Sequence, residues 1–159
     1  MYKVHANHGK DHKVGGQDPI PGVGYAVYAV KVTGDDTTGA DAAVVENGAF
    51  YFGIPGELDG WYVVKFWGYQ ATPANNSGAD TELRLSKRSG YSPASTILTT
   101  NITIANADFF PSVQAVIDNT KNQVVGESTV LAVDIRDLEP DLVWGIGVEI
   151  TLSPVNVLL

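Results

Sequence analysis

The sequence predicts an all-β protein, a β-sandwich body preceded by an extended N-terminal arm. The composition favours this class, because 17 glycines and 8 prolines accompany frequent valine, threonine and tyrosine, which are residues of strands and turns. About nine strand-like segments follow one another at a spacing of roughly 8–15 residues, a pattern typical of sandwiches and jelly rolls. All three histidines stand apart from these segments, at positions 5, 8 and 12. The chain therefore divides into a polar arm and a strand-rich body.

The length of 159 residues suits one ordinary domain or two very small ones. We assign residues 1–21 to the arm and residues 22–159 to the sandwich body. A split of the body near residues 70–93 is an alternative, because this stretch is rich in loop-forming residues.

The charge and the residue inventory exclude several classes of function. A formal net charge of −8 and a pI of about 4.6 argue against nucleic acid and anionic membranes as partners, since the long-range field repels a polyanion. The absence of cysteine excludes disulfides, thiolate chemistry and cysteine-based zinc sites. We expect no signal peptide, because the N-terminus has no apolar core, and no membrane helix, because no apolar run approaches roughly 18 residues.

The first half of the body predicts four strands. The segment Tyr25–Val32 is apolar on both faces, as in a strand that is buried on two sides. Asn47-Gly48 is the strongest short hairpin signal in the chain, and it predicts a tight turn between strands at 42–46 and 49–54. An aromatic-rich strand, Trp61–Trp67, follows.

The second half predicts loops between shorter strands. Residues 70–80 lack periodicity and predict a loop. Between Asn106 and Asp118 we expect at most one helical turn, because Pro111 and β-branched residues interrupt the segment. Short strands are expected at 81–85, 96–104, 113–117 and 129–136.

The last strand has the clearest pattern. Large hydrophobic residues at every second position share one face: Leu142, Trp144, Ile146, Val148, Ile150 and Leu152. This period of two predicts an extended strand with one buried face, since a helix would scatter the six side chains around its circumference. Gly145 and Gly147 on the opposite face predict a bulge or the close approach of another backbone.

The histidines of the arm are candidate metal ligands. On a helix His5, His8 and His12 would line one face and could bind a transition metal, but Gly9 and the Gly15-Gly16 pair weaken a helix. A threefold oligomer offers another route, in which each chain contributes one histidine to a ring. The alternative is a solvated polar arm without a metal, and we expect no cofactor.

The arm also contains a spaced pattern of histidine, glycine, aspartate and proline at residues 12–20. His12-Lys-Val-Gly15-Gly16-Gln-Asp18-Pro19-Ile20 resembles the H-x-x-G-G-x-D-P-[IL] segment near the N-termini of many bacteriophage fibre, spike and head-appendage proteins. In those proteins the segment usually connects an attachment region to a trimeric body. The resemblance implies a virion component, a homotrimer that docks on sister subunits or on other capsid or tail proteins through His12, Gly15, Gly16, Asp18, Pro19 and Ile20. The shortness of the chain favours a capsid decoration or a small head or tail appendage over a long tail fibre.

A second resemblance covers residues 22–70. The run from Val45 to Pro55 and the run from Gly60 to Tyr69 are similar to the alternating glycine, aromatic and proline pattern of transthyretin-like sandwiches, including carboxypeptidase regulatory-like and Cna-B-like modules. These modules are mostly structural or adhesive. The expected body is therefore a sandwich of jelly-roll or immunoglobulin/transthyretin-like type.

The clustered aromatic residues Trp61, Tyr62, Trp67 and Tyr69 offer a candidate ligand surface. On a regular strand Trp61 and Trp67 would share a face with Val63 and Lys65, and a flat aromatic platform beside polar loops can stack on a sugar. The alternative is that these aromatic side chains fill the core or a subunit interface.

Signals of enzymatic activity are weak. Most acids lie in turns, and Asp134 and Arg136 on one strand face are expected to pair with each other or with a neighbouring strand. Acids at Asp35 and Asp36, or at 137–141, could hold Ca²⁺, although no loop has EF-hand spacing. We therefore predict a non-enzymatic structural protein of a phage-like virion that assembles through its arm and its sandwich. The alternative is a carbohydrate-binding or receptor-binding module that uses the clustered aromatics.

Overall fold

The computed structural model describes residues 24–32, 43–72, 78–89, 94–125, 129–138 and 143–157. Within these ranges the chain contains strands and a single 3-10 turn, η1 (Gly56–Leu58), and no α-helix. The prediction of an all-β sandwich is confirmed. The strands are β1 (Ala26–Lys31), β2 (Glu46–Gly53), β3 (Tyr62–Thr72), β4 (Thr81–Ser89), β5 (Ser95–Thr96), β6 (Leu98–Thr100), β7 (Ile102–Ile104), β8 (Val116–Ile117), β9 (Thr129–Asp137) and β10 (Trp144–Ser153).

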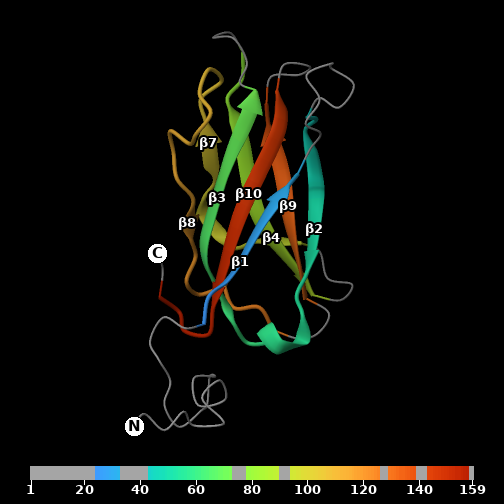
Figure 1. Cartoon of the computed structure of the whole chain (residues 1–159), viewed down its shortest axis with the longest axis vertical. Helices are drawn as coiled ribbons and strands as arrows, with labels where there is room; N and C mark the ends of the chain where they lie inside the picture. Colours follow the sequence, from blue (N-terminus) through green and yellow to red (C-terminus); the bar gives the residue numbers. More distant parts are fainter. Residues whose placement is uncertain are drawn as a thin grey trace, which may run out of the picture.

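Two antiparallel sheets form the sandwich. Sheet A has the strand order β1-β10-β3, and sheet B has the order β2-β9-β4-β5, with β7 also paired to β4. The strands β6 and β8 form a separate two-stranded ribbon. In Figure 1 the strands of sheet A cross in front of β9 and β4 of sheet B. The chain changes sheets at every step from β1 to β4 and again between β9 and β10, so both sheets combine early and late parts of the sequence.

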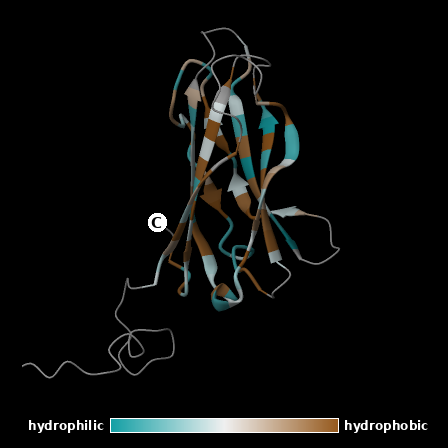
Figure 2. Ribbon diagram, turned by 45° about the vertical axis from the view of Figure 1, so that its right-hand side comes forward, coloured by the Kyte–Doolittle hydropathy of each residue, from teal (hydrophilic) through white to brown (hydrophobic). Residues whose placement is uncertain are grey.

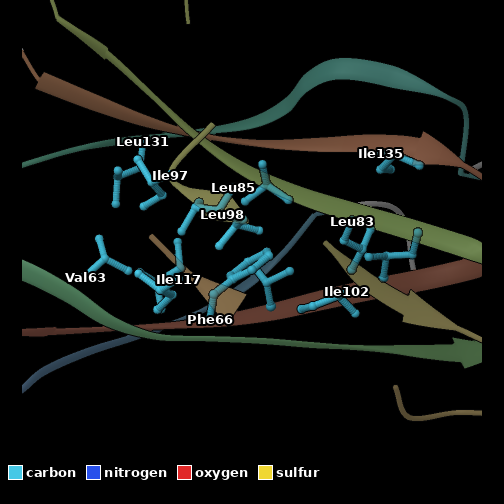
Figure 3. Close-up of a cluster of buried hydrophobic side chains, with 14 of the residues drawn as sticks. Val63, Phe66, Leu83, Leu85, Ile97, Leu98, Ile102, Ile117, Leu131 and Ile135 are labelled. Atoms are coloured by element: carbon cyan, nitrogen blue, oxygen red, sulfur yellow. The ribbon is translucent and has the colours of Figure 1, made fainter. Parts of the chain in front are cut away.

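The core lies between the two sheets and follows the period of two. On β10 the side chains of Ile146, Val148 and Ile150 are buried, as the sequence pattern predicts, and β10 is the central strand of sheet A. Leu83 and Leu85 of β4 face them from sheet B and have no exposed surface. Figure 2 shows the resulting alternation of hydrophobic and hydrophilic bands along several strands, and Figure 3 shows buried side chains from both sheets meeting in the core.

One side of the sandwich is closed by the stretch from β5 to β8. The strands β5 and β7 pair with β4, while Gln70 and Val63 of β3 donate backbone hydrogen bonds to Phe109 and Asn122. The same stretch contributes Ile97 and other residues to the core. The described residues 106–118 contain turns and the short strand β8 and no helix, in agreement with the expectation of at most one helical turn.

The opposite side lies between β1 and β2, the first strands of their sheets, and no described strand pairs with their outer edges. The rings of Tyr28 and Phe52 meet there, with centroids 4.3 Å apart. Large apolar side chains are exposed along this side: Tyr25, Val27, Val44, Val45 and Tyr51. We call this the open side of the sandwich.

The predicted hairpin at Asn47-Gly48 is wrong. Residues 46–53 form the single strand β2, whose register with β9 shifts between Glu46 and Phe50. Gly48 has a φ of 73° and donates its N–H to the carboxylate of Asp134 on β9, at 2.6 Å. The glycine thus supplies the positive φ that the sequence signalled, but it serves a β-bulge instead of a chain reversal.

Candidate functional site

A bulge in β3 decides which side chains reach the outer face of sheet A. The register with β10 shifts by one residue around Val64, so this residue is an extra one in the strand. Before the bulge Val63 is fully buried in the core. After it Phe66 takes the core position, and Lys65 and Trp67 lie on the outer face.

The bulge separates the two tryptophans that the sequence grouped together. The expectation that Trp61, Val63, Lys65 and Trp67 share one face is therefore wrong. Trp61 packs against the core, and its backbone exchanges hydrogen bonds with Leu58 and Val124. Trp67 remains a candidate for ligand contact, whereas Trp61 serves the packing of the sandwich.

Three aromatic side chains lie together on the outer face of sheet A. The Trp67 ring lies 5.7 Å from the Tyr69 ring and 6.0 Å from the Phe110 ring, and the Phe110 pair is stacked with an angle of 26° between ring planes. Tyr69 is 37% exposed and Phe110 is 61% exposed, while Trp67 between them is half-buried. We call Trp67, Tyr69 and Phe110 the aromatic ledge.

A glycine on the neighbouring strand gives the ledge its shape. Gly147 of β10 lies opposite Tyr69 in the register, and a Cβ at Gly147 would come within 2.5 Å of the Tyr69 ring. The ring can lie over β10 because that position has no side chain. At Gly145 (φ 65°) a Cβ would meet the Ala71 side chain at 2.7 Å. The predicted close approach at these glycines is thus made by side chains of β3.

A buried amide fixes the loop that carries Phe110. The side chain of Gln70 has no exposed surface; its Nε2 donates to the carbonyl of Asp108 at 2.6 Å, and its Oε1 accepts from the Thr81 hydroxyl at 2.7 Å. The Gln70 backbone N–H also donates to the carbonyl of Phe109 at 3.0 Å. Because buried polar groups are costly to leave unpaired, these bonds hold residues 108–110 against β3.

An ion pair borders the ledge. Lys65 Nζ lies 2.8 Å from Glu149 Oε1, and Glu149 is the residue opposite Trp67 on β10. The two side chains are 42% and 30% exposed, so the pair adds little to stability and its remaining donors and acceptors face solvent. The ledge therefore combines aromatic surface with both a cation and an anion.

A cavity of about 270 Å³ adjoins the ledge, between β3 and the segment that ends in β8. Its wall includes the apolar side chains of Val64, Phe66 and Ile117, and its polar lining comes from Lys65 and Gln114. Trp67 belongs to both the cavity wall and the ledge. In the described structure no backbone hydrogen bond joins β3 to residues 113–117, whereas Gln70 and Val63 on either side bond to Phe109 and Asn122, so the two segments separate at this point.

On the outer face of sheet B, polar groups form a network of hydrogen bonds with partners inside the protein. The buried carboxylate of Asp134 accepts from Gly48 N, from Arg84 Nε at 2.8 Å and from Ser86 Oγ at 2.9 Å. Arg136 donates to the side chain of Asn47 at 2.7 Å. The expectation that Asp134 pairs with a neighbouring strand is correct, because Arg84 lies opposite it on β4.

The other predicted site residues lie outside the described residues. They are the candidate metal ligands His5, His8 and His12 and the docking residues Gly15, Gly16, Asp18, Pro19 and Ile20. Within the described ranges, no three histidine, cysteine, aspartate or glutamate side chains come together as a metal site would require. No helix in the described part of the chain is long and apolar enough to span a membrane.

Comparison with models of known families, with curated proteins and with solved structures finds no match to this chain. The site therefore stands on its own geometry. Sequence reasoning found Trp67 and Tyr69 from their clustering, but it missed Phe110, Gln70 and the Lys65–Glu149 pair. Phe110 is far from Trp67 in sequence, and the only available signal was the exposed-looking pair Phe109-Phe110 beside Pro111.

Proposed function

We propose that this chain is a non-enzymatic structural protein of a phage-like virion, which assembles through its arm and its sandwich. One observation carries the proposal: β1, the strand that follows the virion-like segment 12–20, is an edge strand of sheet A. An unprotected edge strand presents a row of backbone donors and acceptors and is a ready surface for pairing with another chain.

The apolar residues of the open side support assembly. Tyr25 and Val27 are 42% and 57% exposed on the β1 side, and Tyr51 is 56% exposed on β2. Exposed apolar side chains that gather along one side of a molecule mark contact surfaces more often than isolated ones do. The described part of β1 also lacks the proline, bulge or inward charge with which edge strands are usually protected.

The charge distribution supports contact between the arm and a neighbouring body. The first 23 residues contain three lysines and two aspartates, together with all three histidines. The remaining residues contain seven lysines and arginines against sixteen aspartates and glutamates. A mildly basic arm is attracted to an acidic body, and this attraction favours an assembly in which one subunit's arm lies on another subunit or on an acidic partner.

A non-catalytic role agrees with the hydrogen bonding of the buried Asp134 carboxylate. Among the described residues Asp134 carries the buried carboxylate. It accepts hydrogen bonds from Gly48, Arg84 and Ser86, and these bonds hold neighbouring strands together. A general acid or base must instead reach a substrate. On this proposal the protein acts in the virion, as a homotrimer bound to other capsid or tail proteins.

Native mass spectrometry of the full chain tests the proposal. We expect a mass three times that of the denatured chain, and we expect Ile20→Asp in the arm and Val27→Asp on β1 to lower it. Val157→Asp is the matched control, because this exposed valine follows Asn156, whose side chain bonds to Asn119 and Asn122 on the β3 side of sheet A. A wild-type protein that stays monomeric at all concentrations tested would overturn the proposal.

A further inference from the structure

We infer that the aromatic ledge and its adjoining cavity bind a neutral saccharide. The C–H faces of the sugar pack along Trp67, Tyr69 and Phe110, and its hydroxyls bond to the groups around the ledge. This inference goes beyond assembly, because the ledge lies on sheet A across β10 from the β1 edge.

The ledge has the apolar part of a sugar site. Pyranose rings present C–H groups on their faces, and aromatic side chains bind such faces through their electron-rich rings. Phe110 and Tyr69 are exposed, and the Trp67 ring packs against both of them. The cluster therefore offers a continuous aromatic strip instead of a single ring.

The ion pair of Lys65 and Glu149 beside the ledge favours a polar ligand. Lys65 supplies donors and Glu149 supplies acceptors within 2.8 Å of each other, and both are partly exposed. A hydroxyl group both donates and accepts, so a polyol can bond to both members of the pair. A wholly apolar partner would bury the pair without replacing its contacts with water, which is costly.

The same pair argues for a neutral ligand. An anionic ligand would be attracted by Lys65 and repelled by Glu149 at nearly the same distance, and a cationic ligand would meet the reverse. The pair therefore gives little net preference for either charge. Its chemistry favours a ligand with many hydroxyls and no charge.

The cavity supplies a place for part of the ligand. Its volume of about 270 Å³ is slightly below the range of about 300–1,000 Å³ typical of small-molecule sites. Val64, Phe66 and Ile117 give it apolar walls, and the exposed Gln114 brings an amide that can both donate and accept. The cavity suits one sugar unit or a substituent of it, while the ledge extends the contact to a second unit.

The rings are held in place before any ligand binds. Gln70 holds residues 108–110 on β3, and Gly147 leaves room for the Tyr69 ring. Pre-organised side chains lose little entropy on binding, so more of the contact energy remains for affinity.

The experiment is a glycan array followed by calorimetric titration of the full-length protein with the strongest neutral oligosaccharide on the array. We expect binding of at least one neutral glycan. Trp67→Ala should weaken it roughly tenfold or more, as for loss of an aromatic anchor. Glu149→Gln removes the anionic acceptor from a partly exposed position that does not belong to the core, so it tests the site without endangering the fold. We expect it to weaken binding by about threefold to tenfold.

Val157→Ala is the control, because Val157 is an exposed apolar residue outside both the ledge and the open side, and it should leave glycan affinity unchanged. Binding of charged glycans alone, no glycan binding, or binding that survives both ledge variants would overturn the inference. The native mass of each variant is measured in parallel. If Trp67→Ala lowers the mass and no glycan binds, the ledge is a subunit contact and the inference fails while the assembly proposal stands.

Discussion

The two outer faces of the sandwich differ in how far their functional groups are buried and hydrogen-bonded within the protein. On sheet B the Asp134 carboxylate is buried under the bulge of β2 and bonded to Arg84, Ser86 and Gly48. On sheet A the ledge residues Tyr69 and Phe110 are exposed beside a partly exposed ion pair. The polar groups of the first face are hydrogen-bonded within the protein, whereas the second face has exposed groups that can contact a ligand.

This difference separates a structural cluster from a candidate binding surface. Both faces contain an aromatic side chain, a cation and an anion, so residue types alone do not distinguish them. They differ in the burial and hydrogen bonding of their carboxylates. Asp134 is 2% exposed, while the side chain of Glu149 is 30% exposed. Substitutions on the first face should change stability, and substitutions on the second should change binding.

The largest effect is expected at Asp134. Asp134→Ala leaves the Arg84 side chain, the Ser86 hydroxyl and the Gly48 N–H without their acceptor. We expect the free energy of unfolding to fall by about 3 kcal/mol, because removing one partner of a buried charged network exposes the full desolvation cost of the others. Urea unfolding followed by circular dichroism measures the change.

Glu149→Ala is the matched substitution on sheet A. It removes the exposed ion pair with Lys65 and should cost less than about 1 kcal/mol. Equal losses in the two variants would show that the two faces do not differ as described.

The next effect is expected at Gln70, which connects the core to the ledge. Gln70→Leu keeps the side-chain size but leaves the Thr81 hydroxyl and the Asp108 carbonyl without a partner. We expect a loss of about 2 kcal/mol in unfolding free energy, since each buried orphan group carries a desolvation cost. Tryptophan fluorescence should change as well, because Phe110 is released from Trp67.

A double-mutant cycle with Thr81→Val sharpens the prediction for Gln70. The two residues share one hydrogen bond, so the double variant should lose less stability than the sum of the single variants. Simple additivity, with an unchanged fluorescence spectrum, would mean that the buried amide does not position the ledge.

A smaller effect is expected at the bulge that covers Asp134. Gly48→Ala places a Cβ at a φ of 73° and within 2.2 Å of the Tyr51 hydroxyl. The left-handed backbone should cost about 1–2 kcal/mol, and the flexible end of Tyr51 can move aside at low cost. Thermal unfolding monitors the loss.

Gly60→Ala isolates the backbone part of this cost. Gly60 has a φ of 81°, and no atom lies within 4 Å of a Cβ built there. The two alanine variants should lose similar stability if the backbone dominates at Gly48. A much larger loss at Gly48 would show that the packing of Tyr51 over the bulge is rigid.

The sequence predicts the regular parts of this fold well. The face of β10 follows from the side-chain period alone, because Ile146, Val148 and Ile150 must be buried together or exposed together. The polar pairing of Asp134 also follows from strand parity and charge. The class of the fold needs nothing beyond such local patterns and turn residues.

The sequence fails where a residue outside the local segment decides the outcome. Asn47-Gly48 signals a positive φ correctly, but Asp134, far along the chain, turns that geometry into a bulge. The bulge at Val64 likewise reverses the parity of β3, and this reversal moves Trp67 away from Trp61. Phe110 reaches Trp67 only because the buried Gln70 holds its loop.

The smallest effect is expected at the turn that follows the cavity wall. The pKa of Asp118 is lowered from 3.8 to about 2, mainly by the hydrogen bond from the Thr120 hydroxyl and then by Lys121 and the Thr120 backbone N–H. Because the folded pKa lies below the unfolded one, the carboxylate stabilises the fold above pH 3.8, and this contribution is lost as the pH falls towards about 2.

Asp118→Asn should therefore be less stable than the wild type at neutral pH and equal to it near pH 2, as urea unfolding at a series of pH values will measure. Glu57→Gln on the exposed turn η1 controls for the loss of one negative charge. An Asp118→Asn protein whose stability falls between pH 4 and pH 2 as steeply as that of the wild type would contradict the prediction. Glycan affinity at neutral pH should be unchanged by this substitution, since Asp118 lies outside the residues that line the cavity. An unchanged affinity would indicate that the binding surface ends at β8 and that Asp118 serves stability alone.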